Sequence, residues 1–404
     1  MAHQTLFKSQ GQHSLWPQGN RADAVYGPDE AGDPHSRVQR SVARRIPTLD
    51  ALRGIAACSV VVHHSFQQHL GAGTHSLLGG VGHWLGSWGV AVFFVLSGFC
   101  IHLPQARREA EGNPAVQWRS FAKRRAWRLL PTHYASLIVS TAVASFASSA
   151  ILSGPTIASF LSHVFMVHTL SASTFGSINA VFWSIAVEVH FYATYPLLLR
   201  LRRALGFFLV PSLLLLGLLT YFFASLSGDS SVRFVGQRLF LVSWWQWALG
   251  VTVADLYVRG MAPRFARVVR FRGAAWTWGI VSIAIGLSDP TIMRLHVRYW
   301  MLPVVCALLL GALVVRPPSS ALFRWWERVG TLSYSLYLMH PIALALLLFL
   351  PLAALPFVLR LTLDAAMALL VSWIFFMAVE RHFLNAQLGE SRKAGSRSIS
   401  AAGL

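Results

Sequence analysis

Residues 49–68 read LDALRGIAACSVVVHHSFQQ, an apolar stretch that is long enough to cross a lipid bilayer. It nevertheless contains Asp50, Arg53, His63 and His64. Ionisable side chains in a membrane-spanning helix are costly unless they face the protein interior or a watery cavity. The eleven residues from Arg53 to His64 make about three helical turns, so these two side chains share a face roughly 16 Å apart along the axis. Asp50 falls on the same face, whereas His63 points elsewhere.

The composition indicates a polytopic membrane protein. Of the 404 residues, 55% are hydrophobic and 12% are charged, whereas a soluble domain usually has about twice that charged fraction. The net charge of +19 could suggest nucleic-acid binding, but the arginines lie in short segments between apolar runs, as the positive-inside rule describes. We therefore predict a lipid bilayer and no nucleic acid as partner. The three cysteines lie inside apolar runs without metal-ligand spacing, so we expect no disulfide and no metal.

The apolar runs predict an all-α fold with about ten transmembrane helices. One transmembrane domain over 45–382 would lie between a disordered cytoplasmic tail, 1–44, and a second cytoplasmic tail, 383–404. The shorter apolar segment 156–170 is expected to be interfacial or re-entrant. The predicted spans are 47–68, 85–104, 127–149, 178–199, 204–225, 237–258, 274–290, 297–315, 329–350 and 355–379.

Loop charges predict the orientation of these spans. If the N-terminus is cytoplasmic, eighteen basic residues fall in the inner loops and five in the outer loops. Because basic residues concentrate on the cytoplasmic side of membrane proteins, both termini are expected there. Arg53 would then lie near the inner end of the first span and His64 near its outer end.

Two further segments carry charged residues that need an explanation. The inner segment FAKRRAWRLLPTHY (121–134) has Arg125 and Arg128 on one helical face, an arrangement suited to binding phosphate groups. Simple anchoring at the cytoplasmic interface is the alternative. Glu188 lies mid-membrane in the fourth span, where either a structural ion pair or a catalytic role would account for it.

Other polar positions favour structural interpretations. The pair Ser97–Gly98 is expected to let two helices approach closely. Tyr337 and His340 are three residues apart and share a face of the ninth span. Two acids are expected to pair with an arginine one turn away on their own helix, namely Asp255 with Arg259 and Asp364 with Arg360.

Taken together, five stretches resemble the membrane-bound acyltransferase-3 family, bacterial O-acyltransferases of surface glycans. They occur in the family's order across spans one to nine, and they depart from its pattern slightly at Met339, where aromatic residues are frequent. The stretches are LDALRGIAA with VVHH (49–64), FFVLSGF (93–99), RRAWRLLP (124–131), FWSIAVEVHFY (182–192) and SYSLYLMHP (333–341).

The resemblance assigns roles to particular residues. It implies that Arg53 and His64 form the family's Arg-x10-His signature, which selects His64 over its neighbour. Arg125 and Arg128 would be its Arg-x-x-Arg signature, implicated in binding acyl-CoA at the cytoplasmic face. Glu188 matches the acid of its W-S-x-x-x-E-x-x-F-Y pattern. We further expect substrate contacts from Asp50, Trp183, Tyr337 and His340.

These observations predict an enzyme of the bacterial inner membrane that moves an acetyl group from acetyl-CoA to a hydroxyl of a glycan or glycolipid at the outer face. His64 is the expected base for the hydroxyl, since a neutral imidazole suits that task. Glu188 would orient His64 or hold the acceptor, and Arg53 would fix the thioester or balance Asp50. A fused periplasmic domain is not expected, which weighs against peptidoglycan as acceptor. The alternative is a transporter or flippase of a lipid-linked glycan, for which the sequence has no inverted repeat.

Overall fold

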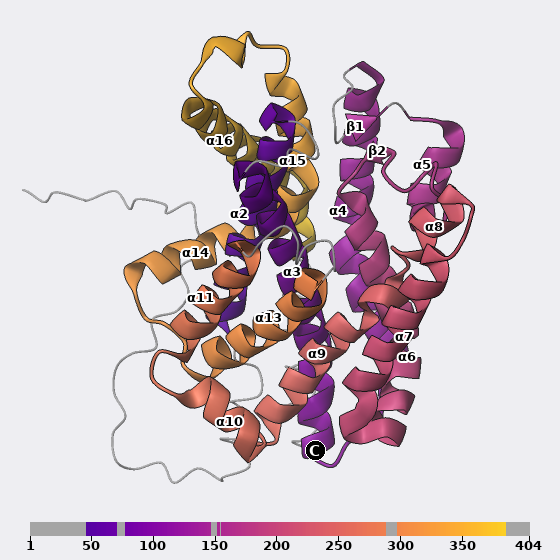
Figure 1. The fold of residues 1–404 in the computed structure, drawn as a ribbon, viewed down its shortest axis with the longest axis vertical. Helices are drawn as coiled ribbons and strands as arrows, with labels where there is room; N and C mark the ends of the chain where they lie inside the picture. Colours follow the sequence, from indigo (N-terminus) through magenta and orange to yellow (C-terminus); the bar gives the residue numbers. More distant parts are fainter. Residues whose placement is uncertain (1–45, 71–76, 147–151, 154, 288–296, 385–404) are drawn as a thin grey trace, which may run out of the picture. The chain divides into compact units, whose positions relative to one another are not determined.

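The computed structural model describes residues 46–70, 77–146, 152–153, 155–287 and 297–384. The predicted tail 1–44 and most of the second tail lie outside these residues. The described residues belong to one unit that begins at Ile46 and is built from helices (Figure 1). Its long helices are α2 (Pro47–Leu70), α3 (Leu77–Ala110), α4 (Trp118–Phe146), α6 (Phe182–Leu205), α7 (Leu209–Ser225), α9 (Phe240–Val258), α11 (Ala274–Leu287), α13 (Val297–Val315), α15 (Ser333–Leu347) and α16 (Phe357–Phe375).

Shorter elements connect the long helices. Two strands, β1 (Leu152–Ser153) and β2 (Ile178–Asn179), pair antiparallel with Leu152 opposite Asn179. The short α-helices are α5 (Ile157–Val164), α8 (Ser230–Gly236), α10 (Pro263–Arg270) and α14 (Ala321–Thr331). Three 3-10 turns, η1 (His168–Leu170), η2 (Gly206–Phe208) and η3 (Leu352–Ala354), and one π-helical turn, η4 (Phe376–Glu380), complete the description.

Each of the ten predicted spans coincides with a helix. Among the described residues, five helical segments are long and apolar enough to cross a membrane, and the pair α14–α15, bent by 69°, could be a sixth. One of the five runs from Phe182 to Ser225, but Gly206, with φ +52°, ends α6 before α7 runs back toward α8 (Figure 1). The all-helical membrane fold is confirmed, whereas the number of ten spans stays a prediction. Segment 156–170 contains the eight-residue α5 and the η1 turn.

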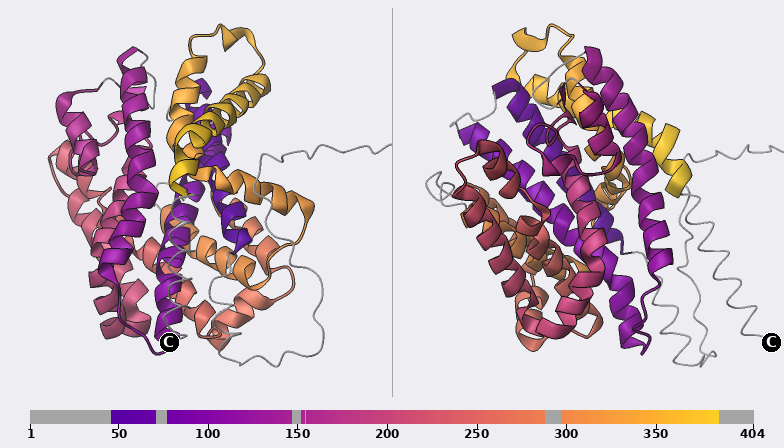
Figure 2. Two further views of the ribbon diagram at one scale, coloured as in Figure 1. Left: turned by 180° about the vertical axis from the view of Figure 1, so that it is seen from behind. Right: turned by 90° about the vertical axis from the view of Figure 1, so that its right-hand side faces the viewer.

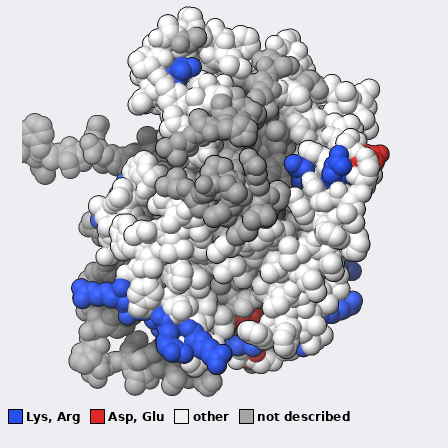
Figure 3. Space-filling view, in the orientation of Figure 1, with Lys and Arg blue, Asp and Glu red and all other residues white. Residues whose placement is uncertain are grey.

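Basic side chains gather at one end of the helical unit. The α3–α4 connection, the α6–α7 junction and α10 lie at the lower end of Figure 1, whereas α5, α8 and the α15–α16 connection lie at the other end. In Figure 3 most Lys and Arg atoms follow the lower edge, and a broad uncharged surface lies above them. This distribution agrees with the predicted alternation of the loops. That the basic end is cytoplasmic stays a prediction.

Helix α2 is held between α3, α14, α15 and α16. Figures 1 and 2 show α15 and α16 beside its C-terminal half. At its N-terminal half α14 crosses at backbone contact, because a Cβ added at Gly330 would lie 1.8 Å from the Asp50 carbonyl oxygen. The predicted close packing at Ser97–Gly98 is confirmed, since a Cβ on Gly98 would lie 2.0 Å from the Trp247 carbonyl oxygen of α9.

The predicted pair between Asp255 and Arg259 is wrong. The Asp255 carboxylate instead accepts two bonds from Arg202, Nε–Oδ2 at 2.5 Å and Nη2–Oδ1 at 2.6 Å, and lies 3.0 Å from Nε2 of His102. A guanidinium that donates two parallel bonds holds a carboxylate better than a single flexible contact. Packing of α6 against α9 therefore overrides the neighbour on the same helix.

The predicted pair between Asp364 and Arg360 is also wrong. Asp364 accepts a hydrogen bond from Ser65 Oγ and lies 2.8 Å from Nε2 of His69, both on α2. The Arg360 guanidinium lies against the Phe357 ring, 5.9 Å from its centroid. The face of α16 that carries Asp364 is buried against α2, so this carboxylate finds its partners across the helix interface.

Candidate active site

Arg53 lies on the N-terminal half of α2, where two partners hold its guanidinium. Proline begins this helix and an acid occupies its first turn, both favourable at a helix start. The acid is Asp50, whose Oδ1 accepts from Nη1 of Arg53 at 2.9 Å, as predicted. Nη2 of Arg53 lies 3.0 Å from Sγ of Cys100 on α3. Arg53 is thus directed away from lipid and toward the space between α2, α3 and α4.

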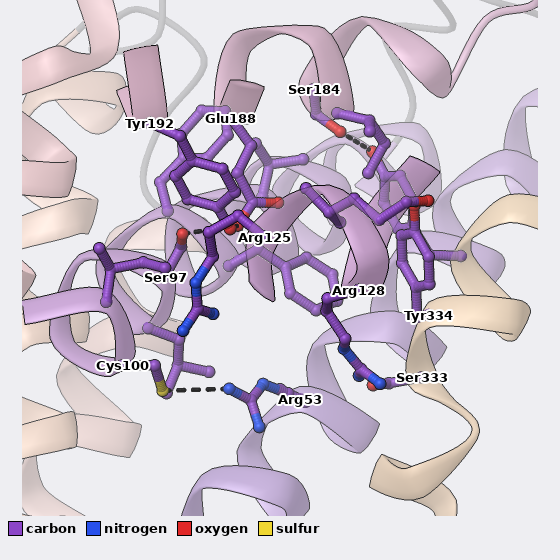
Figure 4. A pocket seen from close by; sticks show the side chains of 18 of the residues that line it. Arg53, Ser97, Cys100, Arg125, Arg128, Ser184, Glu188, Tyr192, Ser333 and Tyr334 are labelled. Atoms are coloured by element: carbon purple, nitrogen blue, oxygen red, sulfur yellow. Dashed lines mark hydrogen bonds between the residues drawn. The ribbon is translucent and has the colours of Figure 1, made fainter. Parts of the chain in front are cut away.

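That space is a cavity of about 380 Å³, which we call the arginine cavity. Figure 4 shows the side chains of Arg53, Arg125 and Arg128 directed into it from α2 and α4. The structure therefore brings together the two arginine motifs that the sequence separates by about seventy residues. Its other labelled lining residues are Ser97, Cys100, Ser184, Glu188, Tyr192, Ser333 and Tyr334.

The two arginines of α4 differ in how their charge is balanced. Nη1 of Arg128 lies 3.5 Å from Oε1 of Glu380, a buried acid in the π-helical turn. The other carboxylate oxygen of Glu380 accepts from the backbone N–H of Ser335 at 3.1 Å and from its hydroxyl at 2.6 Å. Arg125 has no ion pair within the described part of the chain, and its guanidinium lies 6.0 Å from the centroid of the Phe121 ring. The arginine cavity therefore contains one guanidinium, that of Arg125, without a salt-bridge partner among the described residues.

Glu188 lines the arginine cavity and is held by hydrogen bonds. Its Oε1 accepts from Ser97 Oγ at 2.6 Å and from the hydroxyl of Tyr192. Nε1 of Trp247 in turn donates to Ser97 Oγ at 3.2 Å. Of the two explanations that the sequence left open, a structural ion pair is not found within the described residues. Glu188 also makes no described contact with His64, which lines a different cavity.

His64 faces a second cavity of about 220 Å³, which we call the histidine cavity. His63 and His83 also line it, and Nδ1 of His63 lies 2.9 Å from the Gly82 carbonyl oxygen of α3. Trp183 contributes from α6. This cavity lies toward the end of the unit opposite the basic end, because His63 and His64 belong to the C-terminal half of α2 and His83 to the N-terminal part of α3.

The hydrogen bonds of His340 determine the tautomer of His64. Nδ1 of His340 lies 3.0 Å from the Leu336 carbonyl oxygen, which can only accept, so this nitrogen carries the proton. In a neutral imidazole Nε2 is then an acceptor, and it lies 2.9 Å from Nδ1 of His64. Nδ1 of His64 is therefore the donor, and it is also 3.1 Å from the Val60 carbonyl oxygen. Nε2 of His64 is left with a lone pair and no described protein partner, as a general base requires.

The two cavities share one wall. Val90 and Phe94 of α3 and Tyr337 of α15 line both of them. The Tyr337 hydroxyl is 2.6 Å from Ser184 Oγ and 3.3 Å from the Val181 carbonyl oxygen, which fixes the ring in the wall. The polar residues of the first helix thus line two chambers: Arg53 lines one that contains arginines, and His64 lines one that contains histidines.

The sequence-predicted site residues fall into groups around these chambers. Arg53, Arg125, Arg128 and Glu188 line the arginine cavity, and His64 and Trp183 line the histidine cavity. Tyr337 lines both. Asp50 and His340 line neither and act through their contacts with Arg53 and His64. The described residues contain no cluster of three or more ligands that could hold a metal ion.

Sequence reasoning did not select Glu380 or Cys100. A buried acid at the end of the last predicted span is itself a signal, since such residues need a partner in a membrane protein. Cys100 carries no comparable signal, because an isolated cysteine in an apolar run is indistinguishable from a small core residue. Its position beside Arg53 became visible through helix packing alone.

A further histidine cluster lies outside the two cavities. His133 of α4, His163 of α5 and His168 of η1 are fully buried, and the rings of His163 and His168 stack with centroids 3.8 Å apart. His163 and His168 lie in the short connection between α4 and α6, outside the spanning helices. Burial lowers the pKa of His163 to about 4 and that of His168 to about 2. Both are therefore neutral packing groups at neutral pH.

Comparisons with known proteins relate this chain to acyltransferases. A family model described as an acyltransferase domain matches residues 46–377. A protein of Staphylococcus aureus (strain COL) named "Putative O-acetyltransferase" is 25% identical over 335 residues, which cover 74% of this chain and 50% of that protein. The chain thus spans about half the length of the Staphylococcus aureus relatives that it matches.

Two relatives match over shorter regions. The peptidoglycan O-acetyltransferase OatA of Listeria monocytogenes is 31% identical over 170 residues, 40% of this chain and 25% of that protein. The acyltransferase MdmB of Streptomyces mycarofaciens is 32% identical over 168 residues, 39% of this chain and 40% of that protein. No solved structure matches the chain.

Proposed function

Because the chain belongs to the acyltransferase family whose model matches residues 46–377, we propose that it is an integral-membrane O-acyltransferase. It moves an acetyl group from acetyl-CoA to a hydroxyl of a glycan or glycolipid. The observation that carries this proposal is the pair of chambers on either side of one wall, the first cationic and the second containing an imidazole with a lone pair on Nε2.

The arginine cavity suits the acyl donor. Coenzyme A carries several phosphate groups, and guanidinium groups bind phosphate through paired, charge-assisted hydrogen bonds. Arg125 and Arg128 supply such groups, and Arg125 has no ion-pair partner in the described chain that would compete with a phosphate. Arg53, which Asp50 and Cys100 hold, lies where it can contact the thioester end.

The histidine cavity suits the acceptor. Nε2 of His64 takes the proton from the acceptor hydroxyl as the hydroxyl oxygen attacks the thioester carbonyl carbon. The C–S bond then breaks, the ester C–O bond forms, and the proton passes to the coenzyme A thiolate to give the free thiol. His340 holds the ring of His64 and accepts from its Nδ1–H, so it stabilises the imidazolium while the proton is in transit.

The two chambers support a reaction whose substrates arrive from opposite sides. The arginines of the arginine cavity come from α4, which begins at the basic end of the unit, and from the N-terminal half of α2 (Figures 1 and 3). We assign the basic end to the cytoplasm of a bacterial inner membrane by the positive-inside rule. The histidine cavity then lies toward the outer face, where glycan acceptors occur. One relative is named for peptidoglycan and another for acyl transfer without a stated acceptor. We propose a glycan or glycolipid hydroxyl as the acceptor class.

Transfer of radiolabelled acetyl groups by the purified full-length chain in lipid nanodiscs tests this proposal. We expect loss of label from acetyl-CoA that depends on added glycan, release of one free thiol per ester formed, and label in the glycan. A flippase of lipid-linked glycan would leave acetyl-CoA intact and would instead move the lipid between leaflets. Mass spectrometry of surface glycans from cells with and without the protein would then identify the acceptor.

A further inference from the structure

The wall between the two chambers is built mainly from side chains that cannot move easily. Phe94 is buried, with its ring centroid 5.3 Å from that of Phe191. Tyr337 is buried too, its ring packs edge-to-face on Phe93 at 5.4 Å, and Ser184 binds its hydroxyl. Closely packed aromatic rings with satisfied polar groups keep their positions, because displacing them leaves a void or an unpaired hydroxyl.

Val90 is the exception in this wall. Its side chain is aliphatic and partly buried, and it lines both chambers. It has no polar group to satisfy, and it is much smaller than Phe94 and Tyr337. Of the three shared residues, Val90 is therefore the one whose size can be changed without disturbing aromatic packing or a polar contact.

The chambers also differ in size and chemistry on the two sides of this wall. The three site arginines line the larger chamber alone, whereas His63, His64 and His83 line the smaller one alone. At about 220 Å³ the histidine cavity is smaller than the roughly 300 to 1,000 Å³ of ordinary ligand pockets. It has little room for a long acyl chain beside an acceptor hydroxyl.

We infer that Val90, Phe94 and Tyr337 form a selectivity wall that restricts transfer to short acyl groups, with Val90 setting the limit. This inference rests on the proposed function, since it takes the donor to bind in the arginine cavity and the hydroxyl to be activated in the histidine cavity. The acyl carbonyl must cross this wall to reach the acceptor hydroxyl that Nε2 of His64 activates. A longer chain attached to the same carbonyl meets the fixed rings, so its transfer is slower although its coenzyme A portion binds equally well.

Substitutions of Val90 in opposite directions test the inference. Initial rates are measured for acetyl-, propionyl- and butyryl-CoA with wild type, Val90→Ala and Val90→Ile. Because one methylene in a pocket changes discrimination by about tenfold or more, Val90→Ala should raise the ratio of butyryl to acetyl transfer about tenfold. Val90→Ile should lower the ratio of propionyl to acetyl transfer by a similar factor. The affinity for free coenzyme A should not change, since its phosphates bind elsewhere.

Val92→Ala is the matched control, because Val92 lies two residues away on α3, is buried and lines neither cavity. It loses the same two methyl groups but should keep the wild-type chain-length profile. An unchanged profile in both Val90 variants would overturn the selectivity wall while leaving acyl transfer intact. If wild type transferred no acyl group from any coenzyme A ester, the proposed function would fail, and the wall with it. If Val90→Ala does not fold, the conservative Val90→Ile decides the question alone.

Discussion

The arginine and histidine cavities share α2, α3, α6 and α15 in their linings, yet the charged and titratable side chains that line them differ. In the arginine cavity an anion must be attracted, and the structure leaves Arg125 without an ion-pair partner in the described chain while Arg128 is paired with Glu380. In the histidine cavity the proposed reaction needs a group that takes a proton, and His64 has no carboxylate partner among the described residues. His64 is hydrogen-bonded to His340 and a carbonyl oxygen instead.

The difference places two chemically distinct chambers beside one helix. Arg53 and His64 share the stripe along α2, but α3 and α15 divide the space beside it at Val90, Phe94 and Tyr337. Substitutions on one side of this wall should therefore affect donor binding, and those on the other side should affect turnover. The following predictions test that separation, from the largest expected effect to the smallest.

The largest effect is expected for His64→Ala. Loss of a general base lowers the rate by about 10² to 10⁴-fold. The KM for acetyl-CoA should stay near that of wild type, because the phosphates bind in the other chamber. His63→Ala is the control, since His63 lines the same cavity but is directed at the Gly82 carbonyl oxygen. Steady-state kinetics of glycan acetylation measure both. Equal loss in the two variants would contradict the assignment of the base.

Arg125→Ala should act on the other chamber. A charge-assisted hydrogen bond is worth about 1.5 to 3 kcal/mol, so the Kd for coenzyme A should rise by roughly 10 to 100-fold. Turnover at saturating donor should fall far less. Arg128→Ala should have the smaller effect on affinity, because Glu380 already balances part of its charge.

Arg119→Ala controls for the general basic charge of α4, because Arg119 lies on the exposed part of this helix and lines neither cavity. Titration of coenzyme A by calorimetry at two salt concentrations measures each affinity. Phosphate binding predicts that wild-type affinity weakens as salt rises and that Arg125→Ala shows a weaker salt dependence. If Arg119→Ala and Arg125→Ala weakened coenzyme A binding equally, simple interfacial anchoring would be the better explanation for the arginines.

His340→Asn should have an intermediate effect on turnover. The shorter amide side chain has no atom in the position of Nε2, the acceptor that fixes the His64 tautomer, and one hydrogen bond contributes about 1 kcal/mol, so kcat should fall roughly fivefold to tenfold. The pH dependence of kcat should shift as well, whereas a purely structural role would leave that profile unchanged. Donor affinity is the internal control. A variant that bound coenzyme A more weakly but turned over normally would break the proposed separation.

The smallest effects are expected from the two buried carboxylates of the last helix. Asp364 holds Ser65 and His69 of α2 next to the histidine cavity, and Glu380 holds Arg128 at the arginine cavity. Asp364→Asn should therefore lower kcat a few-fold at constant donor KM. Glu380→Gln should raise donor KM by about the same factor at constant kcat. Both follow from a loss of about 1 kcal/mol in positioning. Kinetics with thermal unfolding in parallel separate positioning from loss of fold.

Part of this molecule could be predicted from local patterns. Each apolar run of about twenty residues became a helix, because burying its side chains and satisfying its backbone inside a bilayer leave few alternatives. The resemblance to an acyltransferase family is confirmed by the matching family model. The shared face of Arg53 and His64 follows from helical geometry alone, and the Asp50 contact of Arg53 follows from a spacing of one turn.

Partners on other helices could not be predicted. Asp255 and Asp364 each have an arginine one turn away, yet both bind side chains from a different helix. Spacing along one helix shows which side chains of that helix could pair. Packing between helices decides which carboxylate is buried and which side chains surround it. Of the two roles expected of Glu188, orienting His64 is not supported by the described contacts, because its carboxylate accepts hydrogen bonds from Ser97 and Tyr192 instead.

The sequence by itself determined the helices, the polar stripe of the first one and the family, since these depend on residue type and on spacings within a single helix. Tertiary structure alone decided that the stripe meets two chambers, that His340 sets the tautomer of His64, and that Val90, Phe94 and Tyr337 line both chambers. The physical reason is that a cavity and a hydrogen bond between helices exist through packing. Close approach at Gly98 and Gly330 fixes which faces meet, and no spacing along one helix contains that information.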